Sequence, residues 1–441
     1  MTFRDQQGNT LSGASAEAVA LFDQAVTAFN LYRGDPIGLL DRALGIAPDF
    51  AMAAIMKAHI LAGATEPAAS REAALLVRRL GAMRLNEREA SHLVALGLLL
   101  EGRWTAAALA LDRHGIDHPR DMVALQCGHL LDFYRASARN LRDRLARALP
   151  CWPPELPGYS ILLGMYAFGL EECGDYGRAE EQGRQALALE PLDCWAHHAV
   201  AHVMEMQGRP EDGIGWMQSR ESCWSGDDNF FKVHNWWHRA LCHLELDQPD
   251  QALALYDGPV RAGQSAVALD LVDATALLWR LQLAGLEPGE RWRELASAWE
   301  QHADGRLYPF NDWHAAMAYL GAGQEQDITR LLAQYQANGD GETASWARET
   351  GRPLIEGFVA FRHGDYPLAV ERLYGARHIV NRFGGSHAQR DIIDLTLAEA
   401  ALRGGLPRLS EALARERLAL KPHSGINRSL LARSRTAAAL S

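Results

Sequence analysis

The sequence predicts an all-α fold, a right-handed superhelical solenoid of about 8–10 helix-turn-helix pairs. Ala and Leu dominate the apolar residues, and both favour helix. Alternating runs rich in Val, Ile, Thr and Tyr, which would indicate strands, are nearly absent. Small residues, glycines and prolines recur at a repeat-like period. At 441 residues the chain is longer than a usual single domain, so we expect either several domains or an array of repeats. A repeat array can reach this length as one folded body, because each repeat packs on its neighbours.

The clearest repeat is Tyr159–Pro191. It places Ala167 where two helices must approach closely, Gly174 at the turn, and Ala179 and Ala186 on one face of the second helix. A proline then closes the unit. This order resembles the 34-residue tetratricopeptide pattern, in which small side chains let paired helices pack while Gly and Pro separate them.

The same frame continues along the chain, with Asp247 standing where one turn glycine is expected. The matching small residues, turn glycines and closing prolines are Ala43, Pro48, Ala95, Gly102, Ala107, Pro119, Ala201, Gly208, Gly213, Ala240, Ala252, Gly285, Gly323, Gly364, Ala369, Ala376, Gly405 and Pro422. We therefore expect one continuous solenoid over 1–441, with ragged or capping ends at 1–14 and 425–441. Residues 159–256 hold the clearest repeats and the predicted site region.

The charge balance excludes some classes of partner. With 44 Lys and Arg against 55 Asp and Glu, the net charge is −11, which argues against general binding of nucleic acid or acidic membranes. Six scattered cysteines form no C-x-x-C pair, as expected of reduced thiols. The first residues lack a signal-peptide stretch, and no apolar run of about 18 residues predicts a membrane span. We expect a cytoplasmic protein.

One predicted first helix carries a column of polar residues. Cys194, His198, His202 and Glu205 follow spacings of four, four and three, which put them on one helical face. In the repeat frame this face lines the concave groove. An i, i+4 histidine pair can chelate one metal ion, and zinc accepts Cys, His and Glu ligands.

The next first helix holds a second pair, His234 and His238. Because first helices of neighbouring repeats lie side by side, we expect the two pairs to be neighbours. Zinc or another divalent metal could then bind at His198, His202, His234 and His238. The chain has no H-E-x-x-H motif, so a zincin-type protease is disfavoured. Two histidines on a surface helix are also common without any metal.

Further polar and aromatic residues follow in later repeats. The additional ligand-binding candidates are Trp224, Trp237, Asp273, Trp279, Arg280, Asp312, His314, His387, Arg390 and Asp391. Each also has a structural interpretation: tryptophans pack cores, Asp273 and Arg280 can pair, and an acidic residue can stabilise a helix start. His92 and His129 stand alone on earlier helices, and we interpret them as structural.

Four segments carry a resemblance to a known family. They are HAVAHVMEMQGR (198–209), HNWWHRALCHLE (234–245), DATALLWRL (273–281) and GGSHAQRD (384–391). Together they resemble the tetratricopeptide repeat protein 38 family over most of the chain. The resemblance implies a soluble helical-repeat fold and the importance of these segments. It brings no reaction, cofactor or catalytic set.

Two functions fit the collected residues. In the first, the groove binds a small polar molecule or short peptide, with histidines and Glu205 as polar contacts, tryptophans as stacking surfaces, and Arg280 or Arg390 on an anion. The alternative is an enzyme of hydrolase or proton-transfer type. His198 and His234 would then be acid–base or metal residues, with Glu205 as base or ligand. A protein-interaction scaffold with structural histidines is a third possibility.

Overall fold

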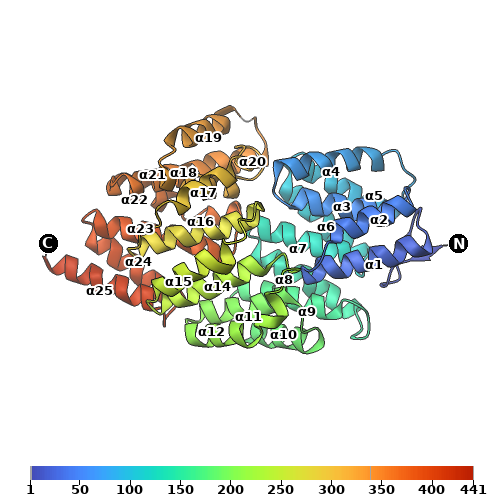
Figure 1. Ribbon diagram of the computed structural model, residues 1–441, viewed down its shortest axis with the longest axis horizontal. Helices are drawn as coiled ribbons and strands as arrows, with labels where there is room; N and C mark the ends of the chain where they lie inside the picture. The colour runs from blue at the N-terminus through green and yellow to red at the C-terminus, as the bar shows by residue number, and fades with distance from the viewer. Residues whose placement is uncertain (1, 338, 441) are drawn as a thin grey trace. The chain divides into compact units, whose positions relative to one another are not determined.

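The computed structural model describes residues 2–337 and 339–440, and most of these residues are helical (Figure 1). The helices group into two compact units. The N-terminal unit comprises the residues up to Val200 together with Ser222–Lys232. The C-terminal unit comprises Ala201–Glu221 together with the residues from Val233 onward.

The first part of the chain forms a short β-hairpin and then consecutive helices. These elements are β1 (Phe3–Arg4), β2 (Thr10–Leu11), α1 (Ala16–Leu31), α2 (Pro36–Ile46), α3 (Ala51–Gly63), α4 (Pro67–Leu80), α5 (Glu87–Leu100), α6 (Trp104–Asp117), α7 (Met122–Tyr134), α8 (Ala138–Ala148), η1 (Leu149–Cys151), α9 (Tyr159–Glu172), α10 (Tyr176–Leu189), α11 (Cys194–Met206), α12 (Pro210–Ser219) and α13 (Glu221–Trp224). The sequence predicted no strand, so the two-residue antiparallel pairing of β1 and β2 is a small correction.

The remaining elements are helices and short helical turns. They are α14 (Lys232–Glu245), α15 (Pro249–Leu255), η2 (Tyr256–Val260), α16 (Ala268–Leu283), α17 (Arg291–Trp299), α18 (Pro309–Ala322), α19 (Glu325–Ala337), α20 (Glu342–Trp346), η3 (Ala347–Gly351), α21 (Arg352–Arg362), α22 (Tyr366–Ala376), η4 (Val380–Arg382), α23 (His387–Arg403), α24 (Pro407–Leu420) and α25 (Gly425–Leu440). Among the described residues no helix is both long and apolar enough to cross a membrane.

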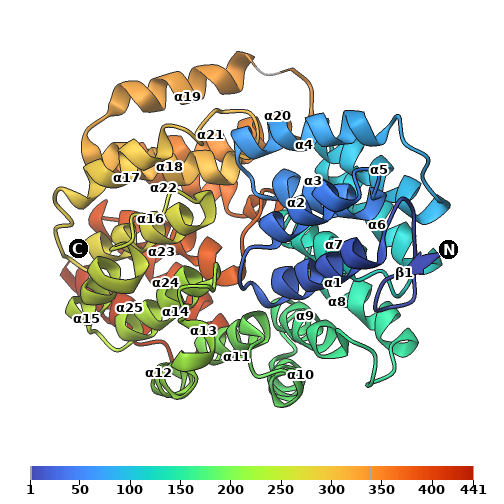
Figure 2. The ribbon, with the colours of Figure 1, turned by 45° about the vertical axis from the view of Figure 1, so that its right-hand side comes forward.

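Successive helices pack as the predicted hairpins. In the N-terminal unit α1 packs on α2, α3 on α4, α5 on α6 and α9 on α10. In the C-terminal unit α21 packs on α22, and α23, α24 and α25 follow one another. Helices α17, α18 and α19 likewise lie side by side (Figure 2). The all-α, tetratricopeptide-like helix-turn-helix fold predicted from the sequence is confirmed.

The best-defined repeat shows why the small residues matter. Ala167, Ala179 and Ala186 are fully buried, and a side chain at Gly183 would meet Val200 at 2.6 Å. The helices can therefore approach more closely than larger residues would allow. At the turn, Gly174 has a φ of +79°.

The predicted replacement of a turn glycine is also seen. Asp247 has a φ of 57°, the left-handed conformation that glycine usually takes. Aspartate is among the few other residues that adopt this conformation readily. The turn between α14 and α15 thus keeps its geometry while presenting a carboxylate.

Large aromatic side chains fill the C-terminal unit between its hairpins. Trp237, Trp279, Trp299, Trp313 and Phe358 are all buried there. Trp279 packs on Phe358 at 4.8 Å between ring centroids, and Trp313 meets the same ring at 5.3 Å. The Trp279–Phe358–Trp313 contacts hold α16, α18 and α21 together, and α16 carries part of the site described next.

Candidate functional site

Three imidazoles of the C-terminal unit converge, and we call His202, His234 and His238 the histidine centre. His202 comes from α11, whereas His234 and His238 lie on successive turns of α14. The Nε2 atoms of His234 and His238 are 3.2 Å apart, and the ring centroids of His202 and His238 are 4.4 Å apart. One nitrogen of each ring lies within 4.8 Å of one nitrogen of the other two. The structure thus brings residues of both predicted columns together.

Carboxylates hold two of these rings from outside the centre. His234 Nδ1 lies 2.8 Å from Asp273 Oδ2, and His238 Nδ1 lies 3.0 Å from Glu205 Oε2. An ionised carboxylate only accepts hydrogen bonds, so each Nδ1 donates its proton. In a neutral imidazole the opposite nitrogen, Nε2, then carries a lone pair. Both lone pairs are directed to the inside of the centre.

Burial and neighbouring charges set the ionisation of Glu205 and His238. Burial raises the pKa of Glu205, but Lys421 and His238 outweigh it and hold that pKa well below 4.5. Burial and the neighbouring His202 lower the pKa of His238 well below 6.5, although Glu205 opposes the shift. Glu205 is therefore ionised and His238 neutral around pH 7.

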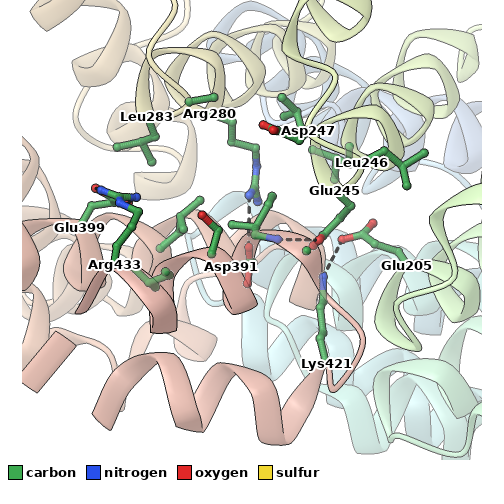
Figure 3. Close-up of a pocket in the computed structure, with 18 residues that line it drawn as sticks. Glu205, Glu245, Leu246, Asp247, Arg280, Leu283, Asp391, Glu399, Lys421 and Arg433 are labelled. Carbon is green, nitrogen blue, oxygen red and sulfur yellow. Dashed lines mark hydrogen bonds and ion pairs between the residues drawn. The ribbon is translucent and has the colours of Figure 1, made fainter. Parts of the chain in front are cut away.

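Glu205 also joins the histidine centre to a cavity. Its Oε1 accepts from Lys421 Nζ at 3.0 Å, while Oε2 serves His238. Both Glu205 and Lys421 line a cavity of about 460 Å³ within the C-terminal unit (Figure 3). Leucines 241, 283, 395 and 430 supply part of its wall. The cavity thus has an apolar side and a charged side, as small-molecule sites usually have.

Carboxylates outnumber cations in the cavity wall. Glu205, Glu245, Asp247, Asp391 and Glu399 face three cations, Arg280, Lys421 and Arg433.

Each cation of the wall already has an acidic partner in the structure. Arg280 bonds Asp391 at 3.1 Å, and Arg433 bonds Glu399 at 2.6 Å. Lys421 bonds Glu205 as described. Figure 3 shows Arg280 pointing into the cavity from α16. The cations of the wall are therefore neutralised.

Two wall carboxylates have no cation at ion-pair distance among the described residues. Glu245 accepts instead from the Ser424 hydroxyl at 2.8 Å and from the Ile426 N–H at 3.4 Å. Asp247 lies exposed at the turn between α14 and α15. Arg417 and Arg403 also pair with Asp391 and Glu399 from outside the wall, so Glu245 and Asp247 are the wall carboxylates that a cationic ligand could pair with.

Four other predicted residues of the C-terminal unit lie beside the histidine centre, in the cavity wall or in the core. Trp237 stacks on His234 with ring centroids 5.3 Å apart, so it forms an apolar wall of the histidine centre. Arg280 and Asp391 belong to the cavity. Trp279, in contrast, donates from Nε1 to Thr396 Oγ1 at 3.0 Å and is a core residue.

Asp312 and His314 lie in the core around α18. Tyr335 donates its hydroxyl to Asp312 at 3.1 Å, and burial raises the pKa of that carboxyl well above 3.8. His314 Nδ1 donates to the Phe310 carbonyl at 2.8 Å, and burial lowers its pKa to about 3. The structure does not bring either residue into the histidine centre or the cavity wall.

The start of α23 holds two more predicted residues. His387 is its first residue, and Ser386 caps the helix by accepting from the Gln389 N–H. Arg390 donates to the backbone carbonyl of Gly385. Arg390 thus contacts the glycine turn, and its predicted anion contact stays a prediction.

Trp224 and His198 belong to the N-terminal unit. Trp224 stacks on His197 with centroids 5.7 Å apart. His198 is buried, and its ring lies 5.3 Å from Phe168 and 5.0 Å from Trp195. Its metal and catalytic roles stay predictions from its spacing on α11.

Several site residues were missed by sequence reasoning. Lys421, Glu245, Glu399 and Arg433 line the cavity, and none of them was a candidate from the sequence. Lys421 is 216 residues from Glu205, a separation with no local signal. A periodic signal did exist elsewhere, since Glu205 and His238 are 33 residues apart, close to one repeat.

A second buried network lies in the N-terminal unit, and we call it the Asp121 network. His92 Nε2 and His114 Nε2 lie 3.0 and 3.2 Å from Asp121 Oδ2, and Arg88 donates to the same oxygen. His59 Nε2 lies 3.1 Å from His92 Nδ1. His92 was interpreted as standing alone; it does not, because residues 33 apart meet across neighbouring repeats.

The similarity of this chain to the solved structures below is distant, at 15% identity or less. No family model matches the chain. Among solved structures, the chain is similar to the APC/C hetero-tetramer Cut9-Hcn1, with a TM-score of 0.44, 15% identity, and 95% of this chain and 76% of that chain covered. A human IFIT1 dimer with PPP-AAAA matches with a TM-score of 0.40 and 13% identity, covering 97% of this chain and 96% of that one. Yeast Tom70 matches with a TM-score of 0.36 and 14% identity, covering 96% and 89%.

Proposed function

We propose that the chain is a ligand-binding repeat protein whose C-terminal unit takes up a small, positively charged polar molecule or the amino terminus of a short peptide. The observation that carries this proposal is the cavity wall, in which five carboxylates face three cations. A ligand that brings its own positive charge would pair with Glu245 and Asp247, which no described Lys or Arg meets at ion-pair distance.

The wall also indicates the shape of the ligand. Leu241, Leu283 and Leu395 would contact an apolar body, while Glu245 and Asp247 would bind an ammonium group. The cavity volume of about 460 Å³ suits a small molecule or a few residues of peptide. Arg280, which is held by Asp391, would position that carboxylate rather than bind an anion.

Three matched probes test this proposal: hexylammonium, 1-hexanol and hexanoate, each titrated calorimetrically into the full chain. The three share an apolar body and differ in charge. We expect hexylammonium to bind at least about tenfold more tightly than the other two, a difference of about 1.4 kcal/mol. Equal affinities for all three probes would contradict the proposal.

Two variants locate the binding. Asp247→Asn removes the charge and keeps a residue that tolerates the left-handed conformation. Glu245→Gln keeps a hydrogen-bond acceptor for Ser424. Each should weaken hexylammonium binding several-fold. Asp250→Asn is the control, because Asp250 lies exposed on α15 and does not line the cavity.

A second candidate function, proton transfer or hydrolysis, is favoured by the Asp273–His234 contact. A carboxylate that holds Nδ1 orients the imidazole and leaves Nε2 to act as a general base. The candidate predicts that His234→Gln abolishes hydrolysis of p-nitrophenyl esters while hexylammonium binding persists. Ester hydrolysis no faster than in buffer would remove this candidate.

A further inference from the structure

The arrangement of nitrogen atoms in the histidine centre goes beyond ligand binding in the cavity. We propose that His202, His234 and His238 bind one divalent transition-metal ion of the zinc type. Asp273 and Glu205 orient two of these ligands without touching the ion.

The spacing of the two α14 histidines fits a shared ion. A tetrahedral zinc ion with Zn–N bonds of about 2.0–2.1 Å sets two ligand nitrogens roughly 3.3 Å apart. His234 Nε2 and His238 Nε2 are 3.2 Å apart. The i, i+4 spacing on one helix makes this possible, since it puts both rings on one face.

The orientation of the rings supplies a second, independent argument. Histidines that bind metals almost always donate the other ring N–H to a carboxylate or carbonyl, which fixes the tautomer and increases the basicity of the ligand atom. Here Asp273 and Glu205 hold the two Nδ1 atoms at 2.8 and 3.0 Å. The two Nε2 atoms are thereby turned to the inside of the centre, where one ion could contact both.

The third ligand comes from a different helix. His202 is fully buried on α11, and one of its nitrogens lies within 4.8 Å of the other two ligand atoms. The three rings move slightly closer together around an ion.

Charge and ligand type agree with this ion. Glu205 and Asp273 bring two negative charges, and Lys421 offsets one of them through the far oxygen of Glu205. Imidazole nitrogens suit zinc, cobalt, nickel and copper, whereas calcium and magnesium prefer oxygen ligands. The centre therefore selects a transition metal over the hard divalent cations.

The test uses the full chain purified without a histidine tag, stripped with chelator and titrated with Co²⁺. We expect the visible absorption of four-coordinate Co²⁺ to saturate at one ion per chain, and Zn²⁺ to displace it. Mg²⁺ should leave the spectrum unchanged. No four-coordinate spectrum, or a stoichiometry far below one, would overturn the proposal and leave a proton shared between His234 and His238.

Matched variants separate a built site from adventitious binding. His238→Gln should abolish the Co²⁺ spectrum, whereas His243→Gln, on the same helix but bonded to Gln248, should leave it unchanged. Equal loss in both variants would overturn the proposal. Asp273→Asn, which spares all three ligands, should weaken Zn²⁺ binding about 10–100-fold with the helical content intact.

Hexylammonium titrations of the metal-free chain keep the two proposals apart. The cavity can bind this probe whether or not the centre binds a metal, and the reverse also holds. Loss of Co²⁺ binding with amine binding retained would therefore overturn the metal site alone.

Discussion

In the Asp121 network the carboxylate lies in the middle and the imidazoles point at it, whereas in the histidine centre the imidazoles lie in the middle and the carboxylates lie outside. Asp121 Oδ2 receives contacts from His92, His114 and Arg88. His234 and His238 instead direct Nε2 at each other. The first arrangement gathers hydrogen-bond donors around one carboxylate, and the second gathers imidazole nitrogens at a place where a cation could bind.

The same residue types therefore serve different purposes in the two units. Burial of His59 and His92 lowers the pKa of both rings, so they are neutral donors and acceptors within a closed network. Arg88 supplies the positive charge that Asp121 needs. Lys421 does the same for Glu205, but no Lys or Arg among the described residues pairs with Asp273, and this difference leaves the histidine centre able to accept a cation.

The largest effect is expected from Asp121→Asn. This change leaves the buried guanidinium of Arg88 without its anionic partner, which should cost about 3–5 kcal/mol of unfolding free energy. Urea unfolding measures the loss. Asp117→Asn, an exposed residue on α6, is the control. Equal and small losses in both variants would contradict the central role of Asp121.

A somewhat smaller effect is expected from Zn²⁺. At a free concentration 100 times its Kd, an ion that binds only the folded state stabilises it by about 2.7 kcal/mol. Hydrogen exchange with mass spectrometry should place the added protection on α11 and α14. Equal protection of α5 and α7, which carry His92 and part of the Asp121 network, would contradict the inference that only the histidine centre binds the ion.

Acidification should affect the N-terminal unit next. The folded-state pKa of His59 and His92 lies below the unfolded value of 6.5, so the unfolded state binds more protons as the pH falls. Their contribution to the free energy of unfolding is complete above pH 6.5. Below pH 6.5 it is lost by up to about 1.4 kcal/mol per group per pH unit. Urea midpoints at pH 7.5 and 5.5 measure this.

Asp121 adds a second loss at lower pH. Burial raises its pKa, but His92 and Arg88 outweigh this and hold it well below 3.8. Its contribution is therefore complete above the unfolded pKa near 3.9 and lost as the pH falls towards the folded value. In a His59→Gln variant the loss of stability between pH 6.5 and 5.5 should be smaller, whereas the loss at lower pH that comes from Asp121 should remain. If the unfolding free energy of this variant fell between pH 7.5 and 5.5 as much as that of the unchanged protein, His59 would be excluded as the source of the loss.

The smallest effect is expected from Arg433→Gln in the cavity wall. The Arg433 side chain is 48% exposed, so its pair with Glu399 contributes under about 1 kcal/mol to stability. Removing the positive charge should strengthen hexylammonium binding about twofold, because two exposed unit charges in water interact by well under about 1 kcal/mol. Weaker binding would indicate that Arg433 contacts the ligand through its alkyl chain instead.

The repeat made most of the fold predictable. Small residues and turn positions recur at a fixed period, and even the substitution of Asp247 for glycine could be read from that frame. The pairing of His202 with His238 followed from neighbouring first helices. The contacts of the Asp121 network could have been predicted in the same way. His59 and His92 are 33 residues apart, as are Arg88 and Asp121, and this separation is close to one repeat.

The cavity could not be predicted in the same way. Lys421 meets Glu205 across 216 residues, and Arg280 meets Asp391 across 111. These contacts join repeats that are distant in sequence, and no periodicity specifies which distant repeats meet. Asp312 and His314 occupied the right frame positions but lie in the aromatic core around α18, since the frame gives a direction for a side chain and not its surroundings.

Glu205 uses its two oxygens for two different partners, Lys421 and His238. A cationic cavity ligand that displaced Lys421 from Glu205 would change the charge beside this carboxylate, and with it the strength of the His238 imidazole as an electron donor. Thermodynamic linkage requires the reverse to hold by the same factor, so a cation at His238 would change the affinity for that ligand equally. A single buried carboxylate is thus enough to give the two sites a reciprocal coupling energy.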